Sequence, residues 1–325
     1  MIVVAQDGIR IRVWDPTPGE QVLLIPDWLA SGRFFAGLRA EIESAVLAPL
    51  LYDPRGSGRS DRPDYGYSLS RDAEDAALVI EEVLGASAFV AGHGYGARVA
   101  LRLALLRPEL VRGVVLMAPA MPGARAESWA EALEDARRLG DLVRNACTRQ
   151  VAPGDLAMLA RDMAQTTRAA GRAQLAAMRE EVGVLPSVLP VAVVAGEFDT
   201  WAPIGIVRRV LQDRAEGQFR LLPACGHYLA WEDPTGVAAA LSRAILGGPP
   251  THAEVVKALG QDEHGEPRDA DRSLIIVDPA TGGDEDRDGN SRWHGGADAH
   301  GPEEAEWPGL GGLGPDGFLD PPGTR

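Results

Sequence analysis

The hydrophobic residues of the first 120 positions form short apolar runs that alternate with longer amphipathic stretches. Ile2–Ala5 and Arg10–Trp14 have the pattern of a β-hairpin, and Val22–Ile25 is typical of a buried strand. Asp72–Leu84 repeats its apolar residues at helical spacing. The other expected elements are the helices Phe34–Ile42 and Arg98–Leu106 and the strands Ala45–Tyr52, Ala88–Ala91 and Val114–Met117. This alternation predicts an α/β fold, with a mostly parallel sheet covered by helices on both faces.

Residues 122–188 interrupt the alternation. Ala126–Asn145 and Asp155–Glu181 both have a helical pattern, with no strand between them. The alternation resumes with the strands Val191–Ala195 and Phe219–Leu222 and the helices Ile204–Gln212 and Thr235–Leu246. The sequence therefore predicts two core segments, 1–121 and 189–248, that are separated by a helical insertion at 122–188.

The last 77 residues, 249–325, have a different composition. They contain 14 Gly and 9 Pro, and 17 Asp and Glu stand against 6 Lys and Arg, which gives −11 of the chain's net charge of −15. Such a segment cannot bury enough apolar surface to order itself. We expect a disordered acidic tail.

Charge and composition exclude several classes of function. A net charge of −15 argues against a nucleic-acid groove, because such a groove gathers Lys and Arg. Two cysteines cannot form a disulfide framework, which argues against a secreted disulfide-rich protein. No apolar run reaches the roughly 20 residues of a membrane span, and Met1–Asp15 lacks the pattern of a signal peptide. We expect a cytoplasmic protein without membrane contact. The 31 arginines against a single lysine indicate a GC-rich bacterial genome.

The candidate chemistry centres on the run Gly92-His93-Gly94-Tyr95-Gly96, at an expected strand-to-helix turn. This run resembles the nucleophile elbow G-x-S-x-G of α/β-hydrolases, where small flanking residues permit a strained turn. Both flanking glycines are present, but Gly94 stands where the family has its nucleophile. The following Arg98-Val99-Ala100 resembles the epoxide-hydrolase and haloalkanoate-dehalogenase branch, whose central residue is Asp.

Three further motifs follow the order of the same family. Asp53-Pro54-Arg55-Gly56-Ser57-Gly58-Arg59-Ser60 resembles a turn after an earlier strand, in which Asp53 and Arg55 are expected to stabilise the turn. Ala195-Gly196-Glu197-Phe198-Asp199 resembles the acid turn, and Cys225-Gly226-His227 resembles the catalytic-histidine loop. The resemblance to the α/β-hydrolase superfamily covers about residues 8–246 and implies that residues 122–188 are the family's cap.

The resemblance implies a His227–Asp199 dyad as the catalytic pair, with Asp199 orienting the imidazole. It places the backbone N–H groups of Trp28 and Tyr95 at the oxyanion hole. Asp27 stands where the family has glycine, so its carboxylate opposes a developing oxyanion. Asp27 and His93 are candidate pocket residues.

No cofactor and no metal ion are expected. His252, His264, His294 and His300 of the tail have no spacing typical of metal ligands.

Three functions remain open from the sequence. The first is an enzyme acting on a small organic molecule by His227–Asp199 acid–base chemistry, namely water addition, elimination, isomerisation or cyclisation. Its attacking group would be water or a substrate atom in the space that Gly94 leaves. The second is a retired hydrolase scaffold that binds a partner, with the acidic tail as its contact. The third is dinucleotide binding, because Gly92-x-Gly94-x-x-Ala97 matches G-x-G-x-x-[GA], although no acidic residue follows the next strand for a ribose.

Overall fold

The computed structural model describes residues 1–44, 47–119, 126–148, 151–180, 182, 189–204, 207, 211 and 217–247. Contacts divide the chain into two units, residues 1–282 and 283–325, and every described residue belongs to the first. The expected tail, 249–325, and most of the expected helix Ile204–Gln212 lie outside the described residues.

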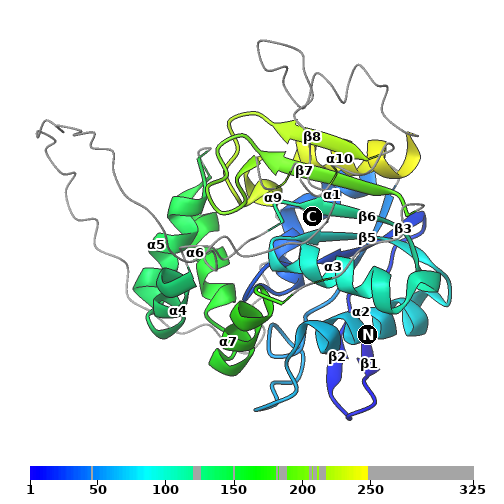
Figure 1. Ribbon diagram of the computed structural model, residues 1–325, viewed down its shortest axis with the longest axis horizontal. Coiled ribbons are helices and arrows are strands. Elements are labelled where there is room, and N and C mark those ends of the chain that lie inside the picture. The colour runs from blue at the N-terminus through cyan, green and yellow to red at the C-terminus, as the bar shows by residue number, and fades with distance from the viewer. Residues whose placement is uncertain are drawn as a thin grey trace, which may run out of the picture. The chain divides into compact units, whose positions relative to one another are not determined.

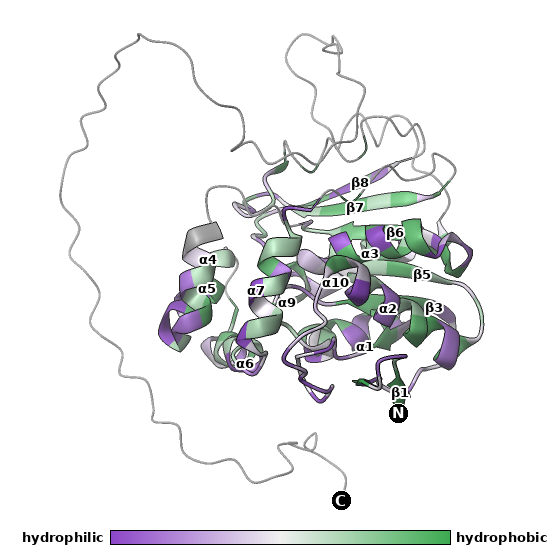
Figure 2. Cartoon of the chain, turned by 60° about the horizontal axis from the view of Figure 1, so that its bottom comes forward, coloured by the Kyte–Doolittle hydropathy of each residue, from purple (hydrophilic) through white to green (hydrophobic). Residues whose placement is uncertain are grey.

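Among the described residues, six parallel strands form the central sheet in the order β4-β3-β5-β6-β7-β8. Their bounds are β3 Glu20–Ile25, β4 Leu47–Leu51, β5 Ala88–His93, β6 Val111–Met117, β7 Val191–Gly196 and β8 Gln218–Leu222. The inner strands are apolar along most of their length because helices cover both of their faces, whereas the edge strand β8 carries hydrophilic positions (Figure 2). This arrangement confirms the α/β fold expected from the sequence.

Helices lie on the two faces of the sheet (Figure 1). α2 and α3 pack together on one face, and α1 and α10 pack together on the other. Their bounds are α1 Ala36–Ser44, α2 Leu69–Leu84, α3 Tyr95–Leu106 and α10 Pro234–Leu246, with short helices η1 Gly32–Phe35, η2 Pro108–Leu110 and α9 Leu229–Glu232. Among the described residues, no helix is long and apolar enough to cross a membrane.

The expected hairpin at the start of the chain is present. β1 Ile2–Val4 pairs antiparallel with β2 Arg10–Arg12, and an isolated bridge joins Val13 to Tyr52 next to β4. The two strands form a small sheet of their own.

In the described part of the chain between β6 and β7, four helices gather beside one end of the sheet (Figure 1). They are α4 Ala126–Glu134, α5 Ala136–Ala146, α6 Pro153–Met163 and α7 Arg168–Ala177. The sequence pattern predicted helical structure over Ala126–Asn145 and Asp155–Glu181, and the structure divides each of these stretches into two helices. Asp135 and Thr167 interrupt the patterns because each caps the N-terminus of a new helix. The Asp135 side chain accepts a hydrogen bond from Arg137 N in α5, and the Thr167 side chain accepts one from Ala170 N in α7.

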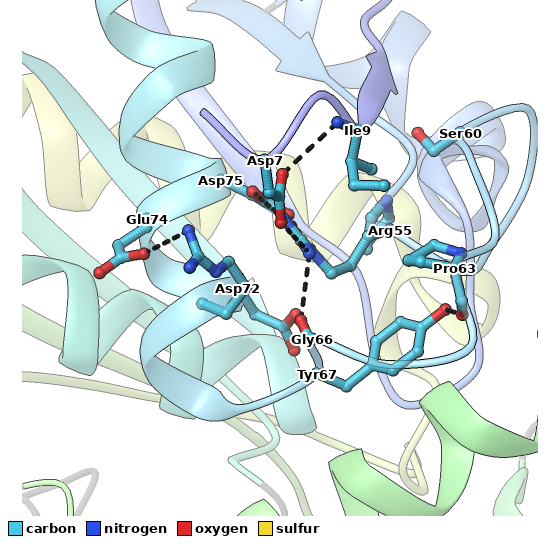
Figure 3. Close-up of polar contacts among 12 residues, drawn as sticks. Asp7, Ile9, Arg55, Ser60, Pro63, Gly66, Tyr67, Asp72, Glu74 and Asp75 are labelled. Carbon is cyan, nitrogen blue, oxygen red and sulfur yellow. Dashed lines mark hydrogen bonds and ion pairs between the residues drawn. The ribbon is translucent and has the colours of Figure 1, made fainter. Parts of the chain in front are cut away.

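The turn after β4 is held by buried charges, as expected for Asp53 and Arg55. The Asp53 carboxylate accepts hydrogen bonds from Gly32 N at 2.9 Å and Arg59 N at 2.8 Å. Figure 3 shows the Arg55 guanidinium between Asp75, Asp7 and the Gly66 carbonyl oxygen. Arg55 is 1% exposed, so these partners compensate for the cost of burying its charge.

Candidate active site

The elbow lies where β5 ends and α3 begins. Gly94 has φ 54° and ψ −115°, in the region of positive φ that side chains other than glycine rarely adopt. Its flanking glycines are required by close packing. A Cβ on Gly92 would lie 2.1 Å from the Gly96 carbonyl oxygen, and one on Gly96 would lie 2.3 Å from the Ile25 carbonyl oxygen. The local sequence therefore forms the strained turn of an elbow without its side chain.

The carboxylate of Asp27 fills the space beside Gly94. A Cβ built on Gly94 would lie 1.9 Å from Asp27 Oδ1 and 2.5 Å from Oδ2, which no real contact allows. The expectation that Gly94 leaves a hollow for water was therefore wrong. The reason is that the loop after β3 carries Asp27, whose side chain turns into the space.

The two backbone donors expected at an oxyanion hole converge on that carboxylate. Trp28 N donates to Asp27 Oδ1 at 2.7 Å, and Tyr95 N donates to the same oxygen at 2.8 Å. The helix α3 begins at Tyr95, so its N-terminus also favours a negative charge here. Asp27 is thus held where a substrate oxyanion would otherwise lie.

His227 lies between two carboxylates. Its Nδ1 is 2.9 Å from Asp199 Oδ2, and its Nε2 is 3.1 Å from Asp27 Oδ2. Asp199 Oδ1 accepts hydrogen bonds from Trp201 N and Ala202 N, which fix this carboxylate. All three side chains are buried. The structure thus places His227 beside Asp199, the pair expected from the sequence, and places Asp27 on the other side of the imidazole.

His93 lies against the same cluster. Its Nε2 is 2.9 Å from the His227 carbonyl oxygen. Its Nδ1 is 3.5 Å from Asp27 Oδ2 and has no hydrogen-bond partner among the described residues. Sequence reasoning identified His93 only as a candidate pocket residue, and nothing in its spacing indicated that Asp27 would meet it across the site.

Charge determines the protonation of the cluster. Burial alone would lower the pKa of His227, but the charges and hydrogen bonds of Asp199 and Asp27 raise it to about 10. Burial alone would raise the pKa of Asp27, but the imidazoles of His227 and His93 hold it well below its ordinary value. At neutral pH Asp27 and Asp199 are therefore carboxylates and His227 is an imidazolium.

Aromatic rings cover the imidazole of His227. The centroid of the Trp201 ring lies 4.7 Å from that of the His227 ring. The Trp129 ring lies next to Trp201, with 4.9 Å between the ring centroids, and the Trp28 ring stacks on Trp129 with 5.7 Å between the centroids. The sequence did not single out Trp201, although its place two residues after Asp199 could have indicated it. The rings help to bury the cluster, and the low local dielectric strengthens its electrostatic interactions.

The phenol of Tyr95 takes no part in the cluster. Its hydroxyl donates to Asp72 Oδ2 at 2.8 Å, and both groups are buried. Of Tyr95, only the backbone N–H therefore reaches Asp27.

The cap holds the loop that carries Asp27 and Trp28. The Trp28 ring donates from Nε1 to the Gly171 carbonyl oxygen at 3.0 Å, and Thr166 Oγ1 donates to the Leu29 carbonyl oxygen at 2.6 Å. Ser31 donates from its backbone N and from Oγ to the Asp162 carboxylate. Leu29 has φ 62°, a strained value for leucine that these bonds maintain. We refer to residues 28–31 as the clamped loop.

A family model described as "Alpha/beta hydrolase family" matches residues 22–240. The chain is 37% identical over 93 residues to 2-(acetamidomethylene)succinate hydrolase of Mesorhizobium japonicum, a match that covers 25% of this chain and 33% of that protein. It is 28% identical over 249 residues to 2-hydroxymuconate semialdehyde hydrolase of Pseudomonas putida, over 68% of this chain and 85% of that protein.

Among solved structures, an esterase of Exiguobacterium antarcticum superposes with a TM-score of 0.68 at 17% identity. That match covers 75% of this chain and 98% of the esterase, and it concerns the fold alone.

Proposed function

The chain belongs to the alpha/beta hydrolase family, and from this premise we propose that it hydrolyses a small carbonyl compound with water as the attacking group. Relatives named as hydrolases of small organic acids and semialdehydes support the class of reaction and of substrate. The observation that carries the proposal is the chain of hydrogen bonds from Asp27 through His227 to Asp199 beside the elbow. Because Gly94 has no side chain that could attack a substrate, the attacking group in this proposal is water.

The cluster contains the groups that hydrolysis by water requires. Asp27 Oδ2 can accept a proton from the attacking water, and His227 Nε2 carries a proton for the leaving group. The 3.1 Å contact between these atoms then allows the proton to return from Asp27 to His227. General acid–base catalysis of this kind contributes about 10²–10⁴-fold.

The test uses a panel of enol amides, carbamates and vinylogous diketones. We expect that Asp27→Asn and His227→Gln each lower kcat at least about 100-fold. Asp15→Asn, on an exposed aspartate, and His252→Gln, in the tail, are the matched controls and should retain the activity of the unmodified chain.

A fluorophosphonate directed at serine nucleophiles distinguishes this reaction from one through an enzyme-bound serine ester. The reagent should not inactivate the protein, because direct attack by water needs no nucleophilic side chain. Stoichiometric labelling by that reagent, or full activity of His227→Gln, would refute the proposal.

The second candidate is a retired scaffold that binds a partner through its acidic tail. It is favoured by the contacts of Asp27, which occupies both Trp28 N–H and Tyr95 N–H, so that neither is free for a substrate oxyanion. It predicts no turnover on the panel, and loss of the biological effect when residues 249–325 are deleted.

A further inference from the structure

We propose that Asp27, His93 and His227 form a buried binding site for a divalent transition-metal ion of the zinc type. Asp27 Oδ2, His93 Nδ1 and His227 Nε2 would be its ligands. Among the described residues, these are the His, Cys, Asp and Glu side chains whose ligand atoms gather in this way, all within 4.8 Å of one another. The inference rests on the proposed function only for its role in catalysis, because binding can be tested alone.

Hydrogen bonds fix which nitrogen of each imidazole carries a proton. His93 Nε2 faces the His227 carbonyl oxygen, which can only accept, so Nε2 carries the hydrogen and Nδ1 of the neutral ring has a lone pair. His227 Nδ1 faces the Asp199 carboxylate and is likewise protonated. In the metal-free protein His227 Nε2 carries a proton toward Asp27 Oδ2, and a bound metal ion would replace that proton. Both His93 Nδ1 and His227 Nε2 are directed at the negatively charged Asp27 Oδ2, so a cation belongs between them.

The distances between the three ligand atoms fit a tetrahedral metal ion, and the contact of His93 is too long for a good hydrogen bond. Ligand atoms about 2.1 Å from a tetrahedral zinc ion stand roughly 3.4 Å apart. Asp27 Oδ2 is 3.1 Å from His227 Nε2 and 3.5 Å from His93 Nδ1. The second of these distances is long for a hydrogen bond, and His93 Nδ1 has no such partner in the described part of the chain.

The surroundings of the ligands are those of a metal site. A histidine that binds a metal usually donates its other ring N–H to a carboxylate or a backbone carbonyl, and here His227 has Asp199 and His93 has the His227 carbonyl oxygen. Trp28 N and Tyr95 N hold the other oxygen of Asp27. A dication would also balance the two buried carboxylates, Asp27 and Asp199.

The site explains the glycine at position 94. Any side chain there would displace the Asp27 carboxylate and remove one ligand. Two imidazoles and one carboxylate leave a coordination position for water, as in catalytic zinc sites. A metal ion there would supply hydroxide as the attacking group at neutral pH, while Asp27 and His227 act as ligands in place of base and acid.

The test measures binding in the full-length chain without a histidine tag. Elemental analysis should find about one Zn²⁺ for each chain, and Co²⁺ added to chelator-treated protein should give the visible bands of a tetrahedral site. X-ray absorption at the zinc edge should report two imidazole nitrogens and one carboxylate oxygen in the unmodified protein, so this measurement does not depend on a variant that folds.

Variants then assign the ligands. Asp27→Asn, His93→Gln and His227→Gln should each weaken Zn²⁺ binding more than about 100-fold, and Asp199→Asn about 10–100-fold. The control replaces His252, His264, His294 and His300 of the tail by alanine and should bind Zn²⁺ like the unmodified chain.

The outcomes separate the two proposals. A chain that binds no stoichiometric Zn²⁺ or Co²⁺, sulfur ligands in the absorption spectrum, or loss of binding in the tail variant alone would overturn the metal site. Hydrolysis that chelators do not affect would then leave the proposed function standing. Binding without turnover on the panel would support the metal site and refute the proposed function.

Discussion

Gly94 and Asp27 depend on each other, and this dependence can be measured as a free energy of unfolding. Gly94→Ala puts a Cβ on a residue at φ 54°, which costs about 1–3 kcal/mol in backbone strain. The Cβ also lies 1.9 Å from Asp27 Oδ1, so the carboxylate must lose at least one of its two backbone donors. Each hydrogen bond to a charged group contributes about 1.5–3 kcal/mol. With one bond lost, we therefore expect Gly94→Ala to destabilise the protein by about 2.5–6 kcal/mol.

Equilibrium unfolding in urea measures this loss, and a double-mutant cycle assigns it. Asp27→Gly removes the carboxylate that the added methyl group would meet, so the double variant should be more stable than the sum of the single variants predicts, by about 1.5–3 kcal/mol. The strain at residue 94 remains in both backgrounds. A Gly94→Ala protein within about 0.5 kcal/mol of the unmodified chain, or a cycle additive within that error, would refute the reasoning.

Three further predictions concern groups around the site. Burial raises the pKa of Asp72 from 3.8 to about 7, so its contribution to stability is present below pH 3.8 and is lost as the pH rises to 7. Relative to the unmodified chain, the free energy of unfolding of Asp72→Asn in urea should therefore rise by roughly 1–4 kcal/mol from pH 4 to pH 8. The same difference between the two proteins at both pH values would contradict this. Arg55→Met should cost about 3–5 kcal/mol because it leaves Asp75 buried without its partner, and Arg55→Met/Asp75→Leu should recover most of the loss in thermal melts; no recovery would mean that Arg55 acts through packing. Asp162→Ala should increase amide hydrogen exchange at residues 28–31, and unchanged exchange would show that the cap does not hold the clamped loop.

Local patterns predicted the fold, because the spacing of apolar residues depends on which faces are buried. The strands β3 and β5 and the helix α2 follow from that spacing alone. The cap was the exception. Its two helical patterns run through Asp135 and Thr167 without a change of composition, and only the capping hydrogen bonds end one helix and begin the next.

The site was predictable to the extent that it depends on order along the chain. His227, Asp199, Trp28 and Tyr95 were named from motifs, and the structure places all four around one point. The orientation of Asp27 was not predictable, because it depends on contact between the loop after β3 and the elbow, 67 residues later. The tautomer of His93 likewise depends on a carbonyl oxygen 134 residues away.

Because the cap is hydrogen-bonded to the clamped loop, entry of a ligand to the site requires the cap and this loop to move together. Gly171, Thr166 and Asp162 of the cap bind the backbone or side chains of residues that directly follow Asp27. The cap therefore cannot swing away as an independent lid, since its departure would pull on the carboxylate that holds the cluster together. The resting protein therefore keeps its reactive groups buried until the joint movement of the cap and the clamped loop admits a ligand.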